Sequence, residues 1–404
     1  MRQIHWLITG LLFLTGLPLG AQTLAEVFEQ AWANHPQAGA LSARANEAQA
    51  AAETTRGLTP GPGSVSASQL DDRFNSHRGR QEWEAEWSIP LWLPGQRSAR
   101  ESQAEGQGTA VAARRTALRL EVAGELREAW WNLAAARDGH RLAPRRVESA
   151  RALEDDIQRR YRAGELARTD ANLAQTERLT AQTEASESEG ALLKAEQAYQ
   201  ALTGTVAPGT LGEEHLDPVL AHHPPALAAD HPRLAAALAA SRLAHATLRV
   251  AEVTRRDAPE LALRLVRDRA NRDESFDTAV GIKLTLPFSS GSKVRQETAG
   301  AQAEAAQADA ELATIRRQLE LALTRAQRDW VLTGQQQDLA RQRRELTADS
   351  LALTGKSFAL GEADLATLLR SRAAALEAGT LFDRQQVARA AAGSRFLQSL
   401  GRLP

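Results

Sequence analysis

The sequence predicts a mostly α-helical protein made of two copies of one unit, each with a long helical hairpin and a pair of β-strands. Three observations lead to this fold class. Landmark residues of the first half recur about 197 positions later. Aromatic residues make up only 4% of the 404 residues, which suits long helices packed through small side chains. In each half, one stretch changes from helical spacing to apolar/polar alternation.

Residues 1–21 predict a signal peptide. Arg2 precedes an apolar run that ends at Leu19, and the small residues Gly20 and Ala21 follow. The run is too short to span a bilayer as a helix, and the three segments have the order found in exported proteins. A short buried helix is the alternative. The chain contains no cysteine, which excludes disulfides and thiolate metal sites.

The repeat divides the mature chain into two units. Four sets of residues return in the same order: Asn34-His35-Pro36 as Asp230-His231-Pro232, Ser88-Ile89-Pro90-Leu91 as Thr285-Leu286-Pro287-Phe288, Tyr161 to Glu165 as Phe358 to Glu362, and Tyr199 with Gly204 as Phe396 with Gly401. We therefore expect a first repeat at 22–204, a linker rich in Pro, His and Gly at 205–229, and a second repeat at 230–404.

Each repeat should open with helix. Thr23 and Glu26 form a capping-box pattern before apolar residues at helical spacing. Pro36 and Pro232 stand where a helix accepts proline in its first turn, so a helix should restart at each of them.

Alternation then predicts strands at 63–70, 81–90, 260–267 and 276–287, joined by polar loops. The charged side chains of one face would line a water-filled lumen: Glu82, Glu84, Glu86, Arg264 and Lys283. The apolar side chains of the other face would meet lipid: Trp83, Ala85, Trp87, Ile89, Val280, Ile282, Leu284 and Leu286. A soluble sheet packed on helices is the alternative.

Four strands cannot close a barrel that has a lumen, and lipid does not tolerate an open sheet edge. Several chains would therefore have to pool their strands. Three chains supply about 12, which lies within the range of outer-membrane barrels. We expect a homotrimer with a small transmembrane β-barrel beside its helical part.

Helical spacing resumes after each strand pair. The first long helix should run from Gly95 to a turn at Gly164, about 69 positions or roughly 100 Å, and the second hairpin should turn at Gly361. The return helix, at about 169–202, is only half as long. Pro144 is expected to kink or split the first helix.

This order of elements resembles the TolC-like outer-membrane efflux family. The resemblance rests most on the run Trp87-Ser88-Ile89-Pro90-Leu91-Trp92, which leads into Gly95-Gln96-Arg97, and on the turns at 161–170 and 358–369; it covers essentially the whole mature chain. It implies a trimeric, passive channel in the outer membrane that extends into the periplasm as a helical tunnel. It also implies a periplasmic adaptor and an inner-membrane pump as partners.

By the same resemblance, the two helical tips would dock onto the adaptor. The candidate residues are Gly164, Glu165, Leu166 and Asp170 at the first tip and Gly361, Glu362 and Ala363 at the second. The glycines also suit a simple helix reversal.

The entrance of the tunnel departs from the family pattern. Where the family has acidic residues in the second tip, this sequence has Thr367 and Arg370. Glu362 and Asp364 are therefore the candidates for a charged ring at the entrance, and a solvated helix tip is the alternative.

The run from Gly361 to Leu369 looks most like the branch that serves heavy-metal pumps for cobalt, zinc, cadmium or copper. It suggests a pump of the RND type that expels heavy-metal cations. The alternatives are a duct for drugs, other small molecules or type I secretion, a periplasmic adaptor protein, and a soluble coiled-coil scaffold.

Other functions find little support. The net charge of −1 gives no positive field to attract nucleic acid. No catalytic motif or phosphate loop stands out, so we expect neither an enzyme nor a cofactor. The linker histidines could be read as a weak metal site, but they lack regular spacing: His215, His222 and His223, beside Glu213 and Glu214. His35 and His231 are expected to cap helices rather than bind metal.

Overall fold

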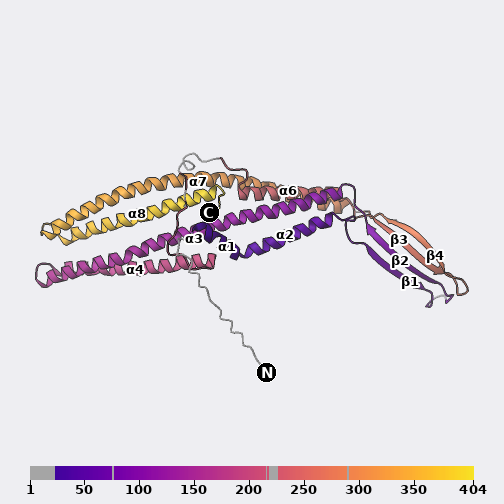
Figure 1. Cartoon of the computed structure of the whole chain (residues 1–404), viewed down its shortest axis with the longest axis horizontal. Coiled ribbons are helices and arrows are strands. Elements are labelled where there is room, and N and C mark those ends of the chain that lie inside the picture. The colour runs from indigo at the N-terminus through magenta and orange to yellow at the C-terminus, as the bar shows by residue number, and fades with distance from the viewer. Residues whose placement is uncertain (1–22, 75–76, 215, 218–225, 289–290) are drawn as a thin grey trace, which may run out of the picture.

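The protein is elongated, with helices along most of its length and four strands at one end (Figure 1). This computed structural model describes residues 23–74, 77–214, 216–217, 226–288 and 291–404. The helices are α1 (Leu24–Asn34), α2 (Pro36–Thr55), α3 (Gln96–Arg162), α4 (Arg168–Thr203), α6 (Pro232–Val253), α7 (Gly291–Ala359) and α8 (Leu365–Ser399). The strands are β1 (Ser64–Asp71), β2 (Gln81–Pro90), β3 (Glu260–Arg269) and β4 (Asp277–Thr285). The expected signal peptide, residues 1–21, lies outside the described residues.

The strands form one antiparallel sheet in chain order, β1-β2-β3-β4. Because β2 pairs with β3, the two repeats share one sheet, and β1 and β4 are its edges. β2 has its predicted range and β1 is shifted by one residue. The prediction for β3 was too short, because its ladder continues until Arg269 pairs with Gln81, the first residue of β2. The prediction for β4 was too long at both ends.

The helix starts agree with the sequence. The Thr23 hydroxyl accepts a hydrogen bond from the Glu26 N–H at 3.3 Å, and the Glu26 carboxylate accepts one from the Thr23 N–H at 3.1 Å. The Nδ1 atoms of His35 and His231 each accept a hydrogen bond from the backbone N–H two residues later. The capping box and both histidine caps are thus confirmed.

The helical hairpins are unequal, as expected: α3 and α7 have 67 and 69 residues, and α4 and α8 have 36 and 35. Pro144 does not split α3, which contradicts one of the two outcomes expected for it. Leu133 before it and Leu153 after it are both buried. Packing therefore holds the turns on either side of the proline, although it removes one helical hydrogen bond.

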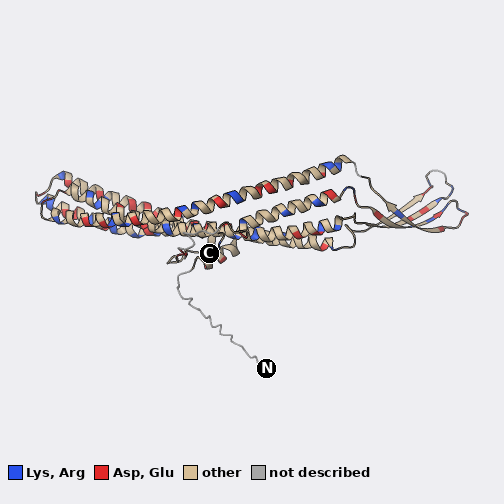
Figure 2. Cartoon of the chain, turned by 90° about the horizontal axis from the view of Figure 1, so that it is seen from above, with Lys and Arg blue, Asp and Glu red and all other residues tan. Residues whose placement is uncertain are grey.

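The helices lie side by side in a fixed order. Toward the tips, α3 packs between α4 and α8, and α7 packs against α8; toward the strands, the order is α2, α3, α6, α7. Figures 1 and 2 show the same arrangement from two directions. One lateral edge of the chain is therefore α7 along its whole length, and the other is α2 and α4. None of the described helices combines the length and apolar composition needed to cross a membrane.

The largest core cluster lies midway along the molecule, where Phe28, Trp130 and Tyr199 bring α1, α3 and α4 together. The described part of 205–229 is more than a connection between the repeats. Leu211 packs against this cluster, and Leu216 packs against a second one around Trp330 and Phe396. The interpretation of this segment as a simple linker was therefore incomplete.

Candidate functional site

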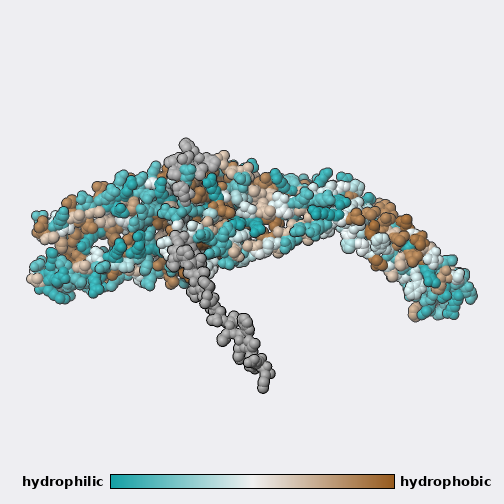
Figure 3. All heavy atoms as spheres, in the orientation of Figure 1, coloured by the Kyte–Doolittle hydropathy of each residue, from teal (hydrophilic) through white to brown (hydrophobic). Residues whose placement is uncertain are grey.

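One face of the sheet is apolar and exposed. Trp87 lies opposite Val65 in β1 and Leu263 in β3, and Ile282 in β4 lies opposite Leu263. This row crosses all four strands, with exposed fractions of 78% for Val65, 55% for Trp87, 49% for Leu263 and 80% for Ile282. Two parallel rows consist of Ala67, Ala85, Leu265 and Val280, and of Ile89, Leu261 and Leu284. Figure 3 shows apolar surface on the part of the sheet nearer the helices and hydrophilic surface at its far end.

The other face carries charges. Arg264 Nη2 donates to Glu84 Oε2 at 2.7 Å, and Lys283 Nζ lies 3.1 Å from Glu86 Oε2. Figure 2 shows charged residues along the strands. The residues predicted for a lumen thus share one face, and two ion pairs tie β3 and β4 to β2.

Carboxylates meet on this charged face at the end of the sheet farther from the helices. Asp268 lies opposite Glu82 on one side and opposite Asp277 on the other. Three neighbouring strands therefore place acidic residues in one row. Glu82 also pairs with Arg80 at 3.4 Å.

The two helical tips have the same backbone. Gly164 and Gly361 have φ angles of 82° and 78°, which favour glycine. After each glycine the chain turns back, so that the Glu165 N–H donates to the carbonyl of Arg160 and the Glu362 N–H to that of Ser357, both at 2.9 Å. Both glycines and both glutamates are exposed, whereas Leu166 and Ala363 are half-buried.

A shared apolar cluster, the tip cluster, joins the two hairpins. Its buried members are Leu153, Ile157, Ala171, Ala174, Phe358, Leu365 and Leu368. The Arg160 guanidinium lies 5.1 Å from the centre of the Phe358 ring. The cluster draws on α3, α4, α7 and α8, so the two tips end at the same level.

The acidic residues just beyond the tips cap the return helices. The Asp170 carboxylate accepts a hydrogen bond from the Ala167 N–H at 3.1 Å, and the Asp364 carboxylate accepts one from the Thr367 N–H at 2.7 Å. Thr367, through its side chain and its backbone N–H, and then the charge of Arg370, lower the pKa of Asp364. Among the ring candidates, Asp364, Thr367 and Arg370 are therefore close together, and Glu362 is exposed at the turn.

A buried ion pair lies at the middle of the molecule, and no sequence pattern indicated it. Arg127 of α3 is only 1% exposed. Its Nε and Nη2 donate to the Glu214 carboxylate at 2.9 and 2.7 Å, and its Nη1 donates to the Arg402 carbonyl at 3.0 Å and to the Gln398 side chain. Trp130 Nε1 donates to the carbonyl of Gly212 at 3.0 Å. The segment before residue 215 is thereby fixed to α3 and to the C-terminal end of the chain.

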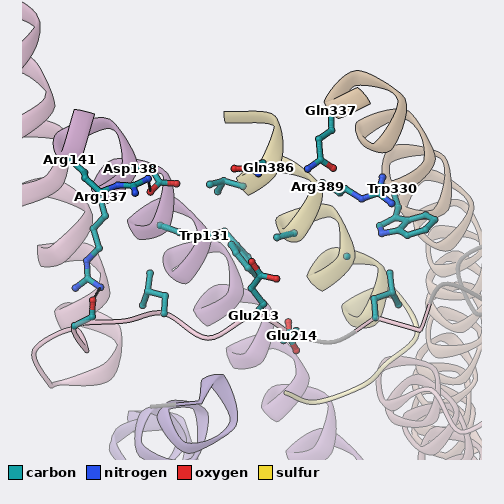
Figure 4. Close-up of a pocket in the computed structure, with 17 residues that line it drawn as sticks. Trp131, Arg137, Asp138, Arg141, Glu213, Glu214, Trp330, Gln337, Gln386 and Arg389 are labelled. Atoms are coloured by element: carbon teal, nitrogen blue, oxygen red, sulfur yellow. Dashed lines mark hydrogen bonds and ion pairs between the residues drawn. The ribbon is translucent and has the colours of Figure 1, made fainter. Parts of the chain in front are cut away.

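A hollow beside this ion pair is lined by α3, α7, α8, residues of 209–214, and Leu216 (Figure 4). Arg141 pairs with Asp138 at 2.9 Å, and the Arg389 guanidinium lies 4.7 Å from the Trp330 ring. In the described ranges, no group of three His, Asp or Glu side chains is placed to hold a metal ion. His215, His222 and His223, the suggested weak metal site, lie outside those ranges.

Comparison with solved structures identifies the fold. The outer membrane channel CmeC of Campylobacter jejuni superposes with a TM-score of 0.75 at 16% identity, over 94% of this chain and 85% of that one. The outer membrane protein VceC of Vibrio cholerae gives 0.75 at 15% identity, over 94% and 96%. CusC, whose structures concern transmembrane channel formation, gives 0.78 at 13% identity, over 94% and 92%. This chain has the fold of these channels. No known protein family and no protein of curated function matches the sequence.

Proposed function

We propose that this protein is the outer-membrane exit duct of a tripartite exporter: a homotrimer that passively conducts cargo from the periplasm to the exterior. The observation that carries the proposal is the sheet. Its one face is exposed and apolar, its other face is charged, and its edge strands are β1 and β4. A soluble protein would cover such an apolar face.

Assembly of three copies would pair the edge strands and place the exposed apolar face of the sheet against lipid. If β4 of each copy pairs with β1 of the next, about 12 strands close a barrel without edges. The apolar rows then face lipid, and Trp83 and Trp87 suit its interfaces. The Arg264–Glu84 and Lys283–Glu86 pairs face water.

The lateral helix edges support the same assembly. From Leu332 to its end, α7 carries an exposed leucine at every seventh position, and Leu360, just after the helix, continues the spacing; these five residues are the α7 stripe. Its exposed fractions are 51% at Leu332, 65% at Leu339, 71% at Leu346, 57% at Leu353 and 75% at Leu360. A seven-residue repeat of leucine is typical of a seam between two packed helices. None of the helices in the described part of the chain covers the α7 stripe, so the proposed assembly supplies a helix from another copy.

The opposite edge offers that helix. Leu179 and Leu193 of α4 are 49% and 55% exposed, and they are two heptads apart. Leu179 is as far along the chain from Gly164 as Leu346 is from Gly361, and Leu193 is as far from Gly164 as Leu332 is from Gly361. Because the tip cluster holds both turns at one level, the leucines of the two edges lie at matching heights. In the proposed trimer, α4 of one copy packs on the α7 stripe of the next.

The helical tips are the proposed docking surface for a periplasmic adaptor, which connects the duct to an inner-membrane pump. The contacting residues are Gly164, Glu165, Leu166, Asp170, Gly361, Glu362 and Ala363. Exposure of both glycines and both glutamates at the far end of the molecule supports this role.

Heavy-metal cations are the proposed cargo, with an RND-type pump as the partner. The acidic row of Glu82, Asp268 and Asp277 supports cation passage, since charged rings concentrate counter-ions in a pore. A strain that lacks this protein should become sensitive to zinc or copper. Sensitivity to drugs alone would instead indicate the drug-efflux alternative.

Fractionation tests the duct itself. The protein should be recovered from detergent-extracted outer membrane as a trimer that dissociates on heating, and a soluble periplasmic monomer would refute the proposal. Leu346→Asp should abolish the trimer, because it places a charge in the α7–α4 seam. Ala348→Asp, two positions away at another exposed site of α7, is the matched control. Equal trimer yields from the two variants would contradict the seam.

The charged ring is tested by conductance. Asp364 caps α8 and keeps its negative charge there, and Glu362 is exposed at the turn, so both carboxylates are proposed for the ring. Glu362→Gln combined with Asp364→Asn should reduce the cation preference of the trimer. An unchanged cation preference would show that neither residue forms the charged ring at the entrance.

A further inference from the structure

We propose that Arg267 and Arg269 form a binding site for the phosphate group of an anionic lipid in the outer leaflet. The inference rests on the proposed function, because it requires the apolar face of the sheet to contact a membrane. Neither arginine has a part in the lumen, in the helical seam or at the tips.

Both arginines lie on the apolar face, at its outer rim. Arg267 is opposite Trp83 and Thr278, one row outward from Leu265 and Val280. Rows on one face are about 7 Å apart, since they are separated by two residues of an antiparallel strand. Arg269 follows in the next row, opposite Gln81. Toward the outer rim, the apolar rows of this face are thus followed by two rows that carry guanidinium groups.

The two guanidinium groups converge on one aromatic ring. They lie 4.8 Å (Arg267) and 4.7 Å (Arg269) from the centre of the Phe276 ring. Arg269 Nη2 also donates to the Gln81 side chain at 3.0 Å, while its buried Nε has no hydrogen-bond partner. Phe276 therefore orients both guanidinium groups, and the side chain of Arg267 is exposed.

The nearby carboxylates are engaged elsewhere or face the lumen. Asp268 and Asp277 belong to the opposite face. Asp71 shares the face of the arginines, but it lies beyond Gln81 and pairs with Arg73 at 3.0 Å. Among the described residues, neither Arg267 nor Arg269 forms an ion pair with a carboxylate.

A lipid phosphate fits this position. The helices occupy the periplasmic side in the proposed duct, so the strand ends that carry Arg267 and Arg269 reach the outer leaflet (Figure 1). An arginine costs much at the bilayer midplane and little near the interface, where headgroups begin. Guanidinium groups bind phosphate through paired hydrogen bonds. A shallow hollow lined in part by Trp83, Leu265 and Phe276 adjoins Arg267 and can receive the apolar part of the same lipid.

The test uses the full-length trimer in nanodiscs of phosphatidylcholine that contain a small fraction of lipid A. Native mass spectrometry counts the lipid A retained by each trimer after delipidation. Arg267→Gln with Arg269→Gln should lower retention about tenfold or more, because each lost charge-assisted hydrogen bond is worth that factor. Arg264→Gln makes the same charge change on the opposite face of β3 and should retain lipid A as the wild type does.

Two arms identify the ligand without relying on variants. Dephosphorylated lipid A should be retained by the wild type about tenfold less than lipid A itself. Inorganic phosphate should not displace lipid A, because it lacks the contact with the hollow. Equal retention of the two lipids, equal retention by the double variant, or displacement by inorganic phosphate would each overturn the proposal. Failure of the proposed function is distinguishable, since the wild type would then be missing from outer-membrane fractions.

Discussion

Replacing Glu214 with glutamine removes the negative charge that faces Arg127. The guanidinium is 1% exposed and makes two of its hydrogen bonds to this carboxylate. Loss of one partner of a buried ion pair costs about 3–5 kcal/mol, because the remaining charge is held away from water without compensation. The cost falls on the docking of the segment that contains Glu214 against α3.

Hydrogen exchange measures this cost locally. In Glu214→Gln, backbone amides in 205–214 and in α3 near Arg127 should exchange at least about a hundredfold faster, the factor that corresponds to the lower limit of 3 kcal/mol. Limited proteolysis should cut the same segment sooner.

Glu128→Gln is the matched control, because Glu128 also forms a two-point pair with an arginine of another element. Arg395 Nε and Nη2 lie 2.6 and 2.7 Å from its carboxylate oxygens, but the two side chains are 54% and 49% exposed. Such a pair contributes at most about 1 kcal/mol. If Glu214→Gln changed exchange no more than Glu128→Gln does, the reasoning from burial would be wrong.

Three further predictions concern single residues. Gly361→Ala should lower the melting temperature, since a Cβ at φ 78° costs roughly 1–2 kcal/mol. Gly355→Ala should raise the melting temperature, because Gly355 lies inside α7 and a Cβ there meets open space. Equal shifts of the two variants would refute the backbone argument. The hydrogen bonds and charge of Arg395 lower the pKa of Glu128. The contribution of Glu128 to stability is therefore complete above about pH 4.5 and is lost as the pH falls through the lowered pKa. Melting curves of Glu128→Gln should lack this part of the acid dependence, and melting curves with the wild-type acid dependence would contradict the prediction. Asp364→Ala removes the cap of α8 and should speed amide exchange in its first turn, while exchange at the first turn of α4 remains as before.

The strands were predictable because apolar and polar residues alternate along most of their length, which fixes the face on which each side chain lies. Trp87, Leu263 and Ile282, which alternate with polar residues in the sequence, share the apolar face in the structure, where they form one row with Val65. The ends were less certain, because pairing partners and not alternation decide them; Arg269 extends β3 only because Gln81 lies opposite.

The buried ion pair was not predictable. An arginine within an amphipathic helix is normally solvent-exposed, and the partner of Arg127 lies far along the chain in a segment without periodicity. The unbroken path of α3 through Pro144 has the same origin, since tertiary packing on both sides overrides the local preference. A sequence pattern does not show which distant residue will compensate for a residue that is unfavourable in its local structure.

The sheet is bounded by β1 and β4, and each presents a row of backbone groups that an isolated chain does not pair. Exposed edges next to an apolar surface join readily to any available strand. In the proposed duct, a newly exported subunit therefore associates non-specifically until it pairs with two correct neighbours, and its yield is expected to fall when subunits accumulate faster than they assemble. Overproduction would then favour aggregates over channels. A holding chaperone in the periplasm would benefit this protein more than it would benefit a channel that a single chain closes.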